Sequence, residues 1–322
     1  MHKHLLSRRQ FSARCAAFGL SLPAASAMLA AQATAQVLGT GAASHPAART
    51  VKLPDGTTVP ALGQGCWHLG QGRHPPAVEE DALRTGISLG MTLIDTSGNY
   101  GDGRSEQLIS RVLAGQRDRV FLVSKVEGDQ VSGDGIARAC AASLARLGTD
   151  YLDLYLLHWP VPREQFSGVV AAFEQLRAAR KIRAWGVSNF NVGQMEDLLR
   201  VPYGSRCATN QVPYSLNNRR IENDVLPWSK QHNIPIMAYS PLGGESHLVV
   251  ADRTLAQIGT THGCSAAAVA LAWVIRSGSV IAIPESGSPA HVRENAVARS
   301  LTLTPRDLQT LDAAYPGAFG AS

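Results

Sequence analysis

The sequence lacks the features that define several common classes of protein. Beyond its N-terminal segment it has no apolar run long enough to span a bilayer, so we predict no stable insertion into a membrane. The first 35 residues hold four of the 30 basic side chains and none of the 25 acidic ones. The remainder is therefore nearly neutral and without a basic cluster, despite the formal charge of +5, which argues against nucleic acid as a partner.

Paired cysteines and a glycine-rich nucleotide motif are also missing. Cys66, Cys140, Cys207 and Cys264 lie far apart, without the short spacings of zinc and redox sites, so we predict no metal site. We expect small buried thiols, although the sequence does not decide whether these four form disulfides. The pattern GxGxxG follows no strand candidate, which disfavours a doubly wound open sheet.

The first 35 residues have the layout of an export signal. Arg8 and Arg9 precede an uncharged stretch at 16–31, and an Ala-Thr-Ala sequence that ends at Ala35 resembles a cleavage site. The paired arginines indicate the Tat export machinery, which would place the mature protein in the periplasm. The alternative is an Ala-rich leader that is not used, which would leave the protein in the cytoplasm. Residues 36–50 are expected to form a flexible lead-in.

From residue 51 to residue 322 the chain alternates short apolar, β-branched runs with longer segments of helical period. A hairpin is expected first, at Val51–Pro60, turning at Asp55-Gly56. Eight strand candidates follow, at Leu62–Cys66, Thr92–Ile94, Val120–Ser124, Leu152–Leu157, Ala184–Val187, Cys207–Asn210, Ile234–Ala238 and Val280–Ile283. Helical periods between them include Glu80–Leu89, Gly135–Leu147, Gly168–Ala179 and Ala266–Ile275. Eight strands with crossovers and no second compositional region predict one α/β domain, a (β/α)8 TIM barrel.

Three successive strand candidates run into an ionisable residue. These residues are Asp95, Lys125 and His158, and Tyr100 follows Asp95 in a loop that contains glycine. Because the strand ends of a barrel share one rim, where active sites are built, we expect the four side chains to meet there. Each alone could be a helix cap, a satisfied buried group or a solvated charge. Their occurrence together on adjacent strands indicates a catalytic site.

These residue types suit the reduction of a carbonyl group, whose oxygen needs a proton as hydride arrives. A free phenol, with a pKa of about 10, is a reluctant acid at neutral pH. We expect Lys125 to lower the pKa of Tyr100, and Asp95 to pair with the lysine. His158 would orient the carbonyl oxygen. A barrel aldolase with Lys125 as its Schiff-base amine is the alternative, but it would have less use for the tyrosine.

With these residues the sequence resembles the aldo-keto reductases, from about Val51 to Pro316. The motifs that carry the resemblance are Asp95-Thr-Ser-Gly-Asn-Tyr100-Gly, Ser124-Lys125, Leu156-Leu157-His158-Trp159-Pro160, Gly186-Val187-Ser188-Asn189-Phe190, Thr209-Asn210-Gln211 and Ala238-Tyr239-Ser240-Pro241-Leu242. The resemblance implies a catalytic tetrad of Asp95, Tyr100, Lys125 and His158, with NADPH or NADH as cofactor and a small carbonyl substrate. Within the family the chain is most similar to bacterial reductases of methylglyoxal and other small aldehydes.

The resemblance also implies where cofactor and substrate bind. The cofactor contacts would be Ser188, Asn189 and Gln211 at the carboxamide, Tyr239 on the nicotinamide ring, Ser240 and Leu242 along the pyrophosphate, and Glu294 and Asn295 at the adenine. The residues at the substrate mouth would be Trp67, His68 and Trp159. The alternatives are that Tyr239 and Trp159 are core aromatics and that Ser188-Asn189 caps a helix.

One departure from the family concerns the 2'-phosphate of NADPH. Where many relatives have Lys-Ser and then, six residues after the lysine, Arg, this sequence has Glu285-Ser286 and His291. A glutamate would repel the phosphate that lysine and arginine clamp, and could instead accept a hydrogen bond from the ribose of NADH. We therefore predict a weakened preference for NADPH. In the alternative, Glu285 turns into solvent and His291 still supports the phosphate.

A rival function is a non-catalytic barrel that binds nucleotide and reports redox state to a partner. A missing member of the tetrad would favour it, and all four residues are present. The physiological substrate, the direction of the reaction and the oligomeric state stay open.

Overall fold

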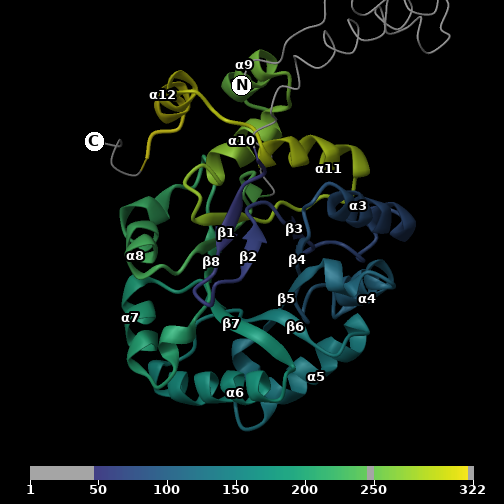
Figure 1. Cartoon of the computed structure of the whole chain (residues 1–322), viewed down its shortest axis with the longest axis vertical. Helices are drawn as coiled ribbons and strands as arrows, with labels where there is room; N and C mark the ends of the chain where they lie inside the picture. Colours follow the sequence, from purple (N-terminus) through teal and green to yellow (C-terminus); the bar gives the residue numbers. More distant parts are fainter. Residues whose placement is uncertain (1–46, 245–249, 318–322) are drawn as a thin grey trace, which may run out of the picture. The chain divides into compact units, whose positions relative to one another are not determined.

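Eight parallel strands form a ring that is surrounded by helices (Figure 1). The computed structural model describes residues 47–244 and 250–317, so the leader predicted at 1–35 lies outside the described residues. The strands are β1 (Thr50–Lys52) and β2 (Thr58–Pro60), which form a hairpin, and β3 (Gln64–Gly65), β4 (Leu93–Asp95), β5 (Phe121–Val126), β6 (Leu152–Leu157), β7 (Ile182–Ser188), β8 (Asn210–Pro213), β9 (Ile236–Tyr239) and β10 (Val280–Ala282). The predicted TIM barrel with an N-terminal hairpin is confirmed.

Helices connect the strands, because parallel neighbours need crossover connections. They are α3 (Pro76–Ser88), α4 (Arg104–Leu113), α5 (Gly135–Leu147), α6 (Phe166–Ala178), α7 (Val192–Arg200), α8 (Val225–His232), α9 (Arg253–His262), α10 (Ala266–Val274), α11 (Pro289–Ala296) and α12 (Pro305–Ala314). α5 has the predicted bounds. α3 begins before the predicted Glu80, because Pro76 fits the first turn, where its missing N–H costs no hydrogen bond. Within 47–244 and 250–317, no helix is both long and apolar enough to cross a membrane.

The ring closes between β3 and β10 through single bridges. The strand order is β10-β9-β8-β7-β6-β5-β4-β3, and Leu62 bridges Ala282 across the remaining gap. Gly65 bridges Glu285 further along the same seam. A Cβ atom on Gly65 would lie 2.8 Å from the carbonyl oxygen of Ile283, so the absence of a side chain permits this close approach.

The structure places the strand that was predicted at Cys207–Asn210 about three residues later in the chain. β8 spans Asn210–Pro213 and shares only Asn210 with the prediction. The ladders on both sides begin at this residue, which pairs with Val187 of β7 and with Ile236 of β9. The prediction was wrong here because the register with the neighbouring strands, and not the apolar character of a segment, fixes where a strand begins.

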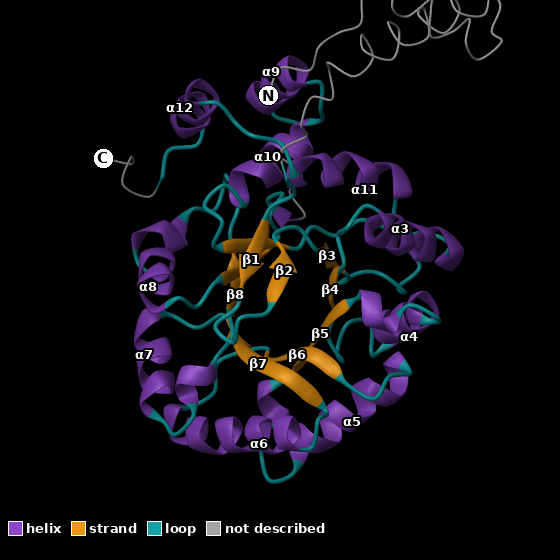
Figure 2. Cartoon of the chain, in the orientation of Figure 1, coloured by secondary structure: helices purple, strands orange, loops and turns teal. Residues whose placement is uncertain are grey.

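The hairpin covers the N-terminal end of the barrel. The Thr57 N–H donates to the Asp55 carboxylate at 2.9 Å, which holds the turn where it was predicted. Val51 and Val59 are buried in one apolar cluster with strand residues such as Leu154. Because β2 leads directly into β3, the hairpin lies at the N-terminal ends of the strands (Figure 2). The opposite rim, at the C-terminal ends, is left for function.

The four cysteines of the barrel are free thiols. Cys66, Cys140 and Cys207 are buried, and Cys264 is partly exposed. Burial raises the pKa of all four, to about 12 for Cys140 and Cys207. Buried thiols were expected, and the structure confirms them at three of the four positions.

Candidate active site

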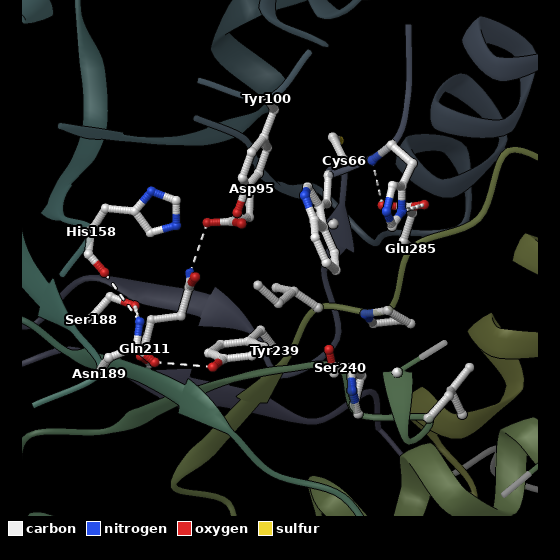
Figure 3. Close-up of a pocket in the computed structure, with 18 of the residues that line it drawn as sticks. Cys66, Asp95, Tyr100, His158, Ser188, Asn189, Gln211, Tyr239, Ser240 and Glu285 are labelled. Carbon is white, nitrogen blue, oxygen red and sulfur yellow. Dashed lines mark hydrogen bonds and ion pairs between the residues drawn. The ribbon is translucent and has the colours of Figure 1, made fainter. Parts of the chain in front are cut away.

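The C-terminal ends of three neighbouring strands bring the four predicted catalytic side chains together. Asp95 ends β4, Lys125 is next to last in β5, and His158 directly follows β6. Tyr100 comes from the loop after β4, and its ring points toward Asp95 (Figure 3). Lys125 Nζ lies 2.7 Å from the Asp95 carboxylate and 3.1 Å from the Tyr100 hydroxyl. The four side chains meet at one rim, and their catalytic roles stay predictions.

Each hydrogen of the Lys125 ammonium group has an acceptor. It donates to the Asp95 carboxylate, to the Thr96 carbonyl at 2.8 Å and to the Tyr100 oxygen. Because an ammonium group only donates, the Tyr100 oxygen accepts this bond and its own hydrogen points elsewhere. Tyr100 also lines a cavity, so that hydrogen is available to a molecule bound there.

Burial decides the direction in which the pKa of Tyr100 shifts. Desolvation raises this pKa and Lys125 lowers it, and the net pKa lies above the ordinary value of 10.0. Lys125 lowers the pKa as expected, but burial, which was not considered, is the larger effect and makes the net shift upward. Burial lowers the pKa of Lys125, but Asp95 and Tyr100 outweigh it and the pKa is raised. Both groups are protonated at neutral pH, as a proton donor and its supporting cation need to be.

His158 has a partner that was not expected from the sequence. Its Nδ1 contacts the Glu127 carboxylate and lies 3.5 Å from the Ser97 hydroxyl. The ring meets Tyr100 edge-on, with 5.8 Å between the centroids. Glu127 follows Lys125 by two residues, in extended backbone just beyond the end of β5, and residues two apart in extended backbone point to the same side. That spacing was the available signal, and no motif marked it.

A cavity of about 550 Å³ opens at this rim. The predicted residues that line it are Trp67, His68, Asp95, Tyr100, His158, Trp159, Ser188, Asn189, Gln211, Tyr239, Ser240, Leu242 and Glu285. Lys125 lies buried behind Tyr100. The predicted residues outside its lining are Ser286, His291, Glu294 and Asn295, on α11 and the segment before it. Two loop residues that were not predicted for the site, Arg73 and Asn99, also line the cavity.

Hydrogen bonds between lining residues fix one wall of the cavity. Gln211 donates to the Asp95 carboxylate at 2.8 Å, and Ser188 donates to the Gln211 carbonyl at 2.8 Å. Tyr239 donates to the Asn189 side chain at 3.0 Å (Figure 3). Asn189 has a φ of 64°, which is uncommon for a residue other than glycine. Residues with such backbone angles occur often at functional sites. The wall is polar and presents one aromatic ring.

Glu285 pairs with His68 at the seam of the barrel. Its carboxylate accepts a hydrogen bond from the His68 backbone N–H at 2.8 Å and contacts Nδ1 at 2.9 Å. His68 in turn stacks on Trp67, with 4.2 Å between the ring centroids. The Glu285 side chain is 26% exposed, so the alternative in which it turns away into solvent is wrong.

Known proteins are similar to the chain over nearly the whole barrel. A model of the aldo/keto reductase family matches residues 61–316. Methylglyoxal reductase YeaE of Escherichia coli K12 is 45% identical over 275 residues, which cover 84% of this chain and 96% of that protein. The crystal structure of an aldo/keto reductase from Klebsiella pneumoniae with NADP and acetate is 42% identical, with a TM-score of 0.80 over 84% of this chain and 96% of its own. A K. pneumoniae structure with NADPH gives the same values.

Proposed function

Because the chain belongs to the aldo/keto reductase family, we propose that it reduces small aldehydes and ketones such as methylglyoxal with NADPH or NADH. The observation that carries this proposal is the bond from Lys125 to the Tyr100 oxygen, which leaves the phenol hydrogen free for the cavity. The relatives support it, since one is a methylglyoxal reductase and the two similar crystal structures contain NADP or NADPH.

The reduction needs a hydride at the carbonyl carbon and a proton at its oxygen. The nicotinamide cofactor supplies the hydride when bound, and Tyr100 supplies the proton from its hydroxyl. Lys125 stabilises the phenolate that this transfer leaves, while Asp95 keeps the buried lysine paired. His158, beside the edge of Tyr100, orients the carbonyl oxygen by a hydrogen bond.

The wall of the cavity fits a nicotinamide group. Tyr239 presents an aromatic ring on which a flat heteroaromatic ring can stack. The amides of Asn189 and Gln211 and the Ser188 hydroxyl supply the donors and acceptors that a carboxamide needs. Their mutual hydrogen bonds hold them in place before a cofactor arrives. We propose Ser240 and Leu242, further along the cavity, as neighbours of the pyrophosphate.

An activity assay tests the proposal. Purified protein receives NADPH or NADH together with methylglyoxal, other small aldehydes or simple ketones, and oxidation of the cofactor is followed. We expect turnover of several small carbonyl compounds. A protein that binds cofactor and reduces none of them would contradict the proposal and favour the rival function, a barrel that reports redox state to a partner.

We propose further that residues 1–35 direct the protein to the periplasm through the Tat machinery. The support is the Arg8-Arg9 pair, the uncharged stretch at 16–31 and the small residues that end at Ala35. Cell fractionation tests this with the wild type and a variant in which both arginines are changed to lysine. We expect periplasmic wild type and cytoplasmic variant, and a wild type confined to the cytoplasm would contradict the proposal.

A further inference from the structure

His158 and Glu127 form a carboxylate–imidazole pair at the rim of the cavity. Glu127 Oε1 contacts His158 Nδ1, and the two side chains are 23% and 11% exposed. Val126 and Leu157 are paired in the ladder between β5 and β6, so the residues that follow them leave the sheet side by side. The His158 N–H also donates to the Val126 carbonyl at 2.9 Å. The backbone therefore holds the two side chains together.

This pair decides which hydrogens the His158 ring carries. An ionised carboxylate only accepts hydrogen bonds, so the Nδ1 atom that contacts Glu127 must carry a hydrogen. A neutral imidazole has one N–H, and Nε2 then presents a lone pair. A lone pair on Nε2 would repel a carbonyl oxygen, and Nε2 can donate to that oxygen only when the ring carries both hydrogens.

We propose that Glu127 is a positioning residue that makes the imidazolium form of His158 the form that binds the carbonyl oxygen during reduction. The inference rests on the proposed function and deepens it. A charged donor stabilises the negative charge that develops on the oxygen more strongly than a neutral donor. His158 keeps both hydrogens throughout, since the proton that ends on the alcohol comes from Tyr100.

Among the residues that the structure describes, Glu127 is the charged side chain in direct contact with the ring. The other groups around the ring are the Ser97 hydroxyl, the edge of Tyr100, the indole of Trp159 and, behind Tyr100, the ion pair of Asp95 with Lys125. The serine and the indole are neutral, and burial holds the pKa of Tyr100 above 10.0, so that phenol is neutral as well. The ion pair is balanced in charge.

The pH dependence of kcat/KM for carbonyl reduction at saturating cofactor tests the proposal. In the wild type we expect kcat/KM to fall about tenfold or more as the pH rises, because a ring with a single hydrogen keeps it on Nδ1 against Glu127 and offers none to the carbonyl oxygen. Tyr100 cannot cause this fall, because its pKa lies above 10.0. In Glu127→Gln the amide can donate to Nδ1, so the neutral ring can carry its hydrogen on Nε2, and the fall should shrink to less than about threefold.

Asp129→Asn is the matched control. Asp129 is an exposed carboxylate in the 3₁₀ turn Gly128–Gln130, two residues beyond Glu127, and its replacement should leave the wild-type pH profile unchanged. A Glu127→Gln profile that runs parallel to the wild-type profile, lowered by one factor at every pH, would show that Glu127 only supports the fold. That result would overturn the proposal.

Nuclear magnetic resonance shows which nitrogen of the His158 ring carries the hydrogen, without any need for turnover. In protein labelled with ¹⁵N-histidine, and with a His158→Asn variant to assign the signals, the neutral ring should carry its hydrogen on Nδ1 in the wild type. In Glu127→Gln it should carry that hydrogen on Nε2. The same tautomer in both proteins would overturn the proposal. If the wild type reduces no carbonyl compound, the proposed function fails, while this spectrum still decides the state of the pair.

Discussion

Glu285 binds His68 through both of its carboxylate oxygens, at 2.8 Å from the backbone nitrogen and 2.9 Å from Nδ1. Both residues line the cavity, and Glu285 stands where the resemblance to the family leads one to expect a lysine that clamps the 2'-phosphate. A phosphate that approaches the segment after β10 therefore meets a carboxylate that His68 holds in place. The pairing also anchors the loop that carries Trp67 to the end of the last strand.

We predict that the wild type prefers NADPH over NADH by less than about a hundredfold in kcat/KM, or ~2.7 kcal/mol. Glu285→Lys should raise the ratio of the two kcat/KM values about tenfold or more, since it replaces repulsion of the phosphate by attraction. Glu285→Gln removes the charge without reversing it and should give an intermediate ratio. A stronger preference in the wild type, or an unchanged ratio in the lysine variant, would contradict the prediction.

Tyr100→Phe removes the hydroxyl that we propose as the proton donor and keeps the ring. We expect kcat/KM for methylglyoxal to fall about 100-fold to 10,000-fold, as loss of general acid catalysis requires. Calorimetric binding of NADPH should change little, because the hydroxyl bonds to Lys125 and not to the wall at Tyr239. Tyr155→Phe is the control, since it removes a buried hydroxyl without a hydrogen-bond partner. Near wild-type turnover in Tyr100→Phe would exclude this residue as the acid.

Lys125→Met tests whether Asp95 depends on the lysine. The change conserves volume but leaves a buried carboxylate without its counter-ion, with Gln211 as a remaining donor. We expect the free energy of unfolding, measured in urea, to fall by ~3–5 kcal/mol. The double variant with Asp95→Asn should recover part of this loss. A loss in the single variant below ~1 kcal/mol would show that the carboxylate tolerates isolation.

Buried thiols should make the protein less stable at high pH. Burial raises the pKa of Cys140 and Cys207 from 9.0 to about 12. Above pH 9.0 the unfolded chain releases these protons while the folded chain keeps them, so the free energy of unfolding should fall as pH rises toward about 12. Urea midpoints at about pH 8 and about pH 10 measure the fall. In a variant with both cysteines replaced by alanine, the urea midpoint should fall less between the two pH values. An equal fall in the variant and the wild type would show that these thiols are not its cause.

The meeting of the catalytic candidates could be predicted from the sequence, because all strands of a closed parallel barrel end on the same rim. Once Asp95, Lys125 and His158 each end an apolar run, a barrel must place them on one rim, and the structure does so. Contacts made by residues beyond the strand ends could not be predicted in the same way. The bond from Glu285 to His68 depends on where a loop returns across the seam, which no local pattern specifies.

The direction in which the pKa of Tyr100 shifts could not be predicted for a related reason. A motif names the lysine next to the phenol, but it does not say how deeply the phenol is buried, and burial is the larger effect here. The contact between Glu127 and His158 could not be predicted either. The spacing from Lys125 indicates the side to which Glu127 points, but the contact with His158 depends on the register between β5 and β6.

Two of the five tryptophans stand at the mouth of the cavity, and their position makes the site optically visible. Trp67 and Trp159 are each 52% exposed, whereas Trp185, Trp228 and Trp273 are buried. Reduced nicotinamide absorbs light in the range in which indole emits, so a bound cofactor should quench the fluorescence of the exposed pair by energy transfer. Binding of the cofactor could then be followed by tryptophan fluorescence alone, even in variants without catalytic activity.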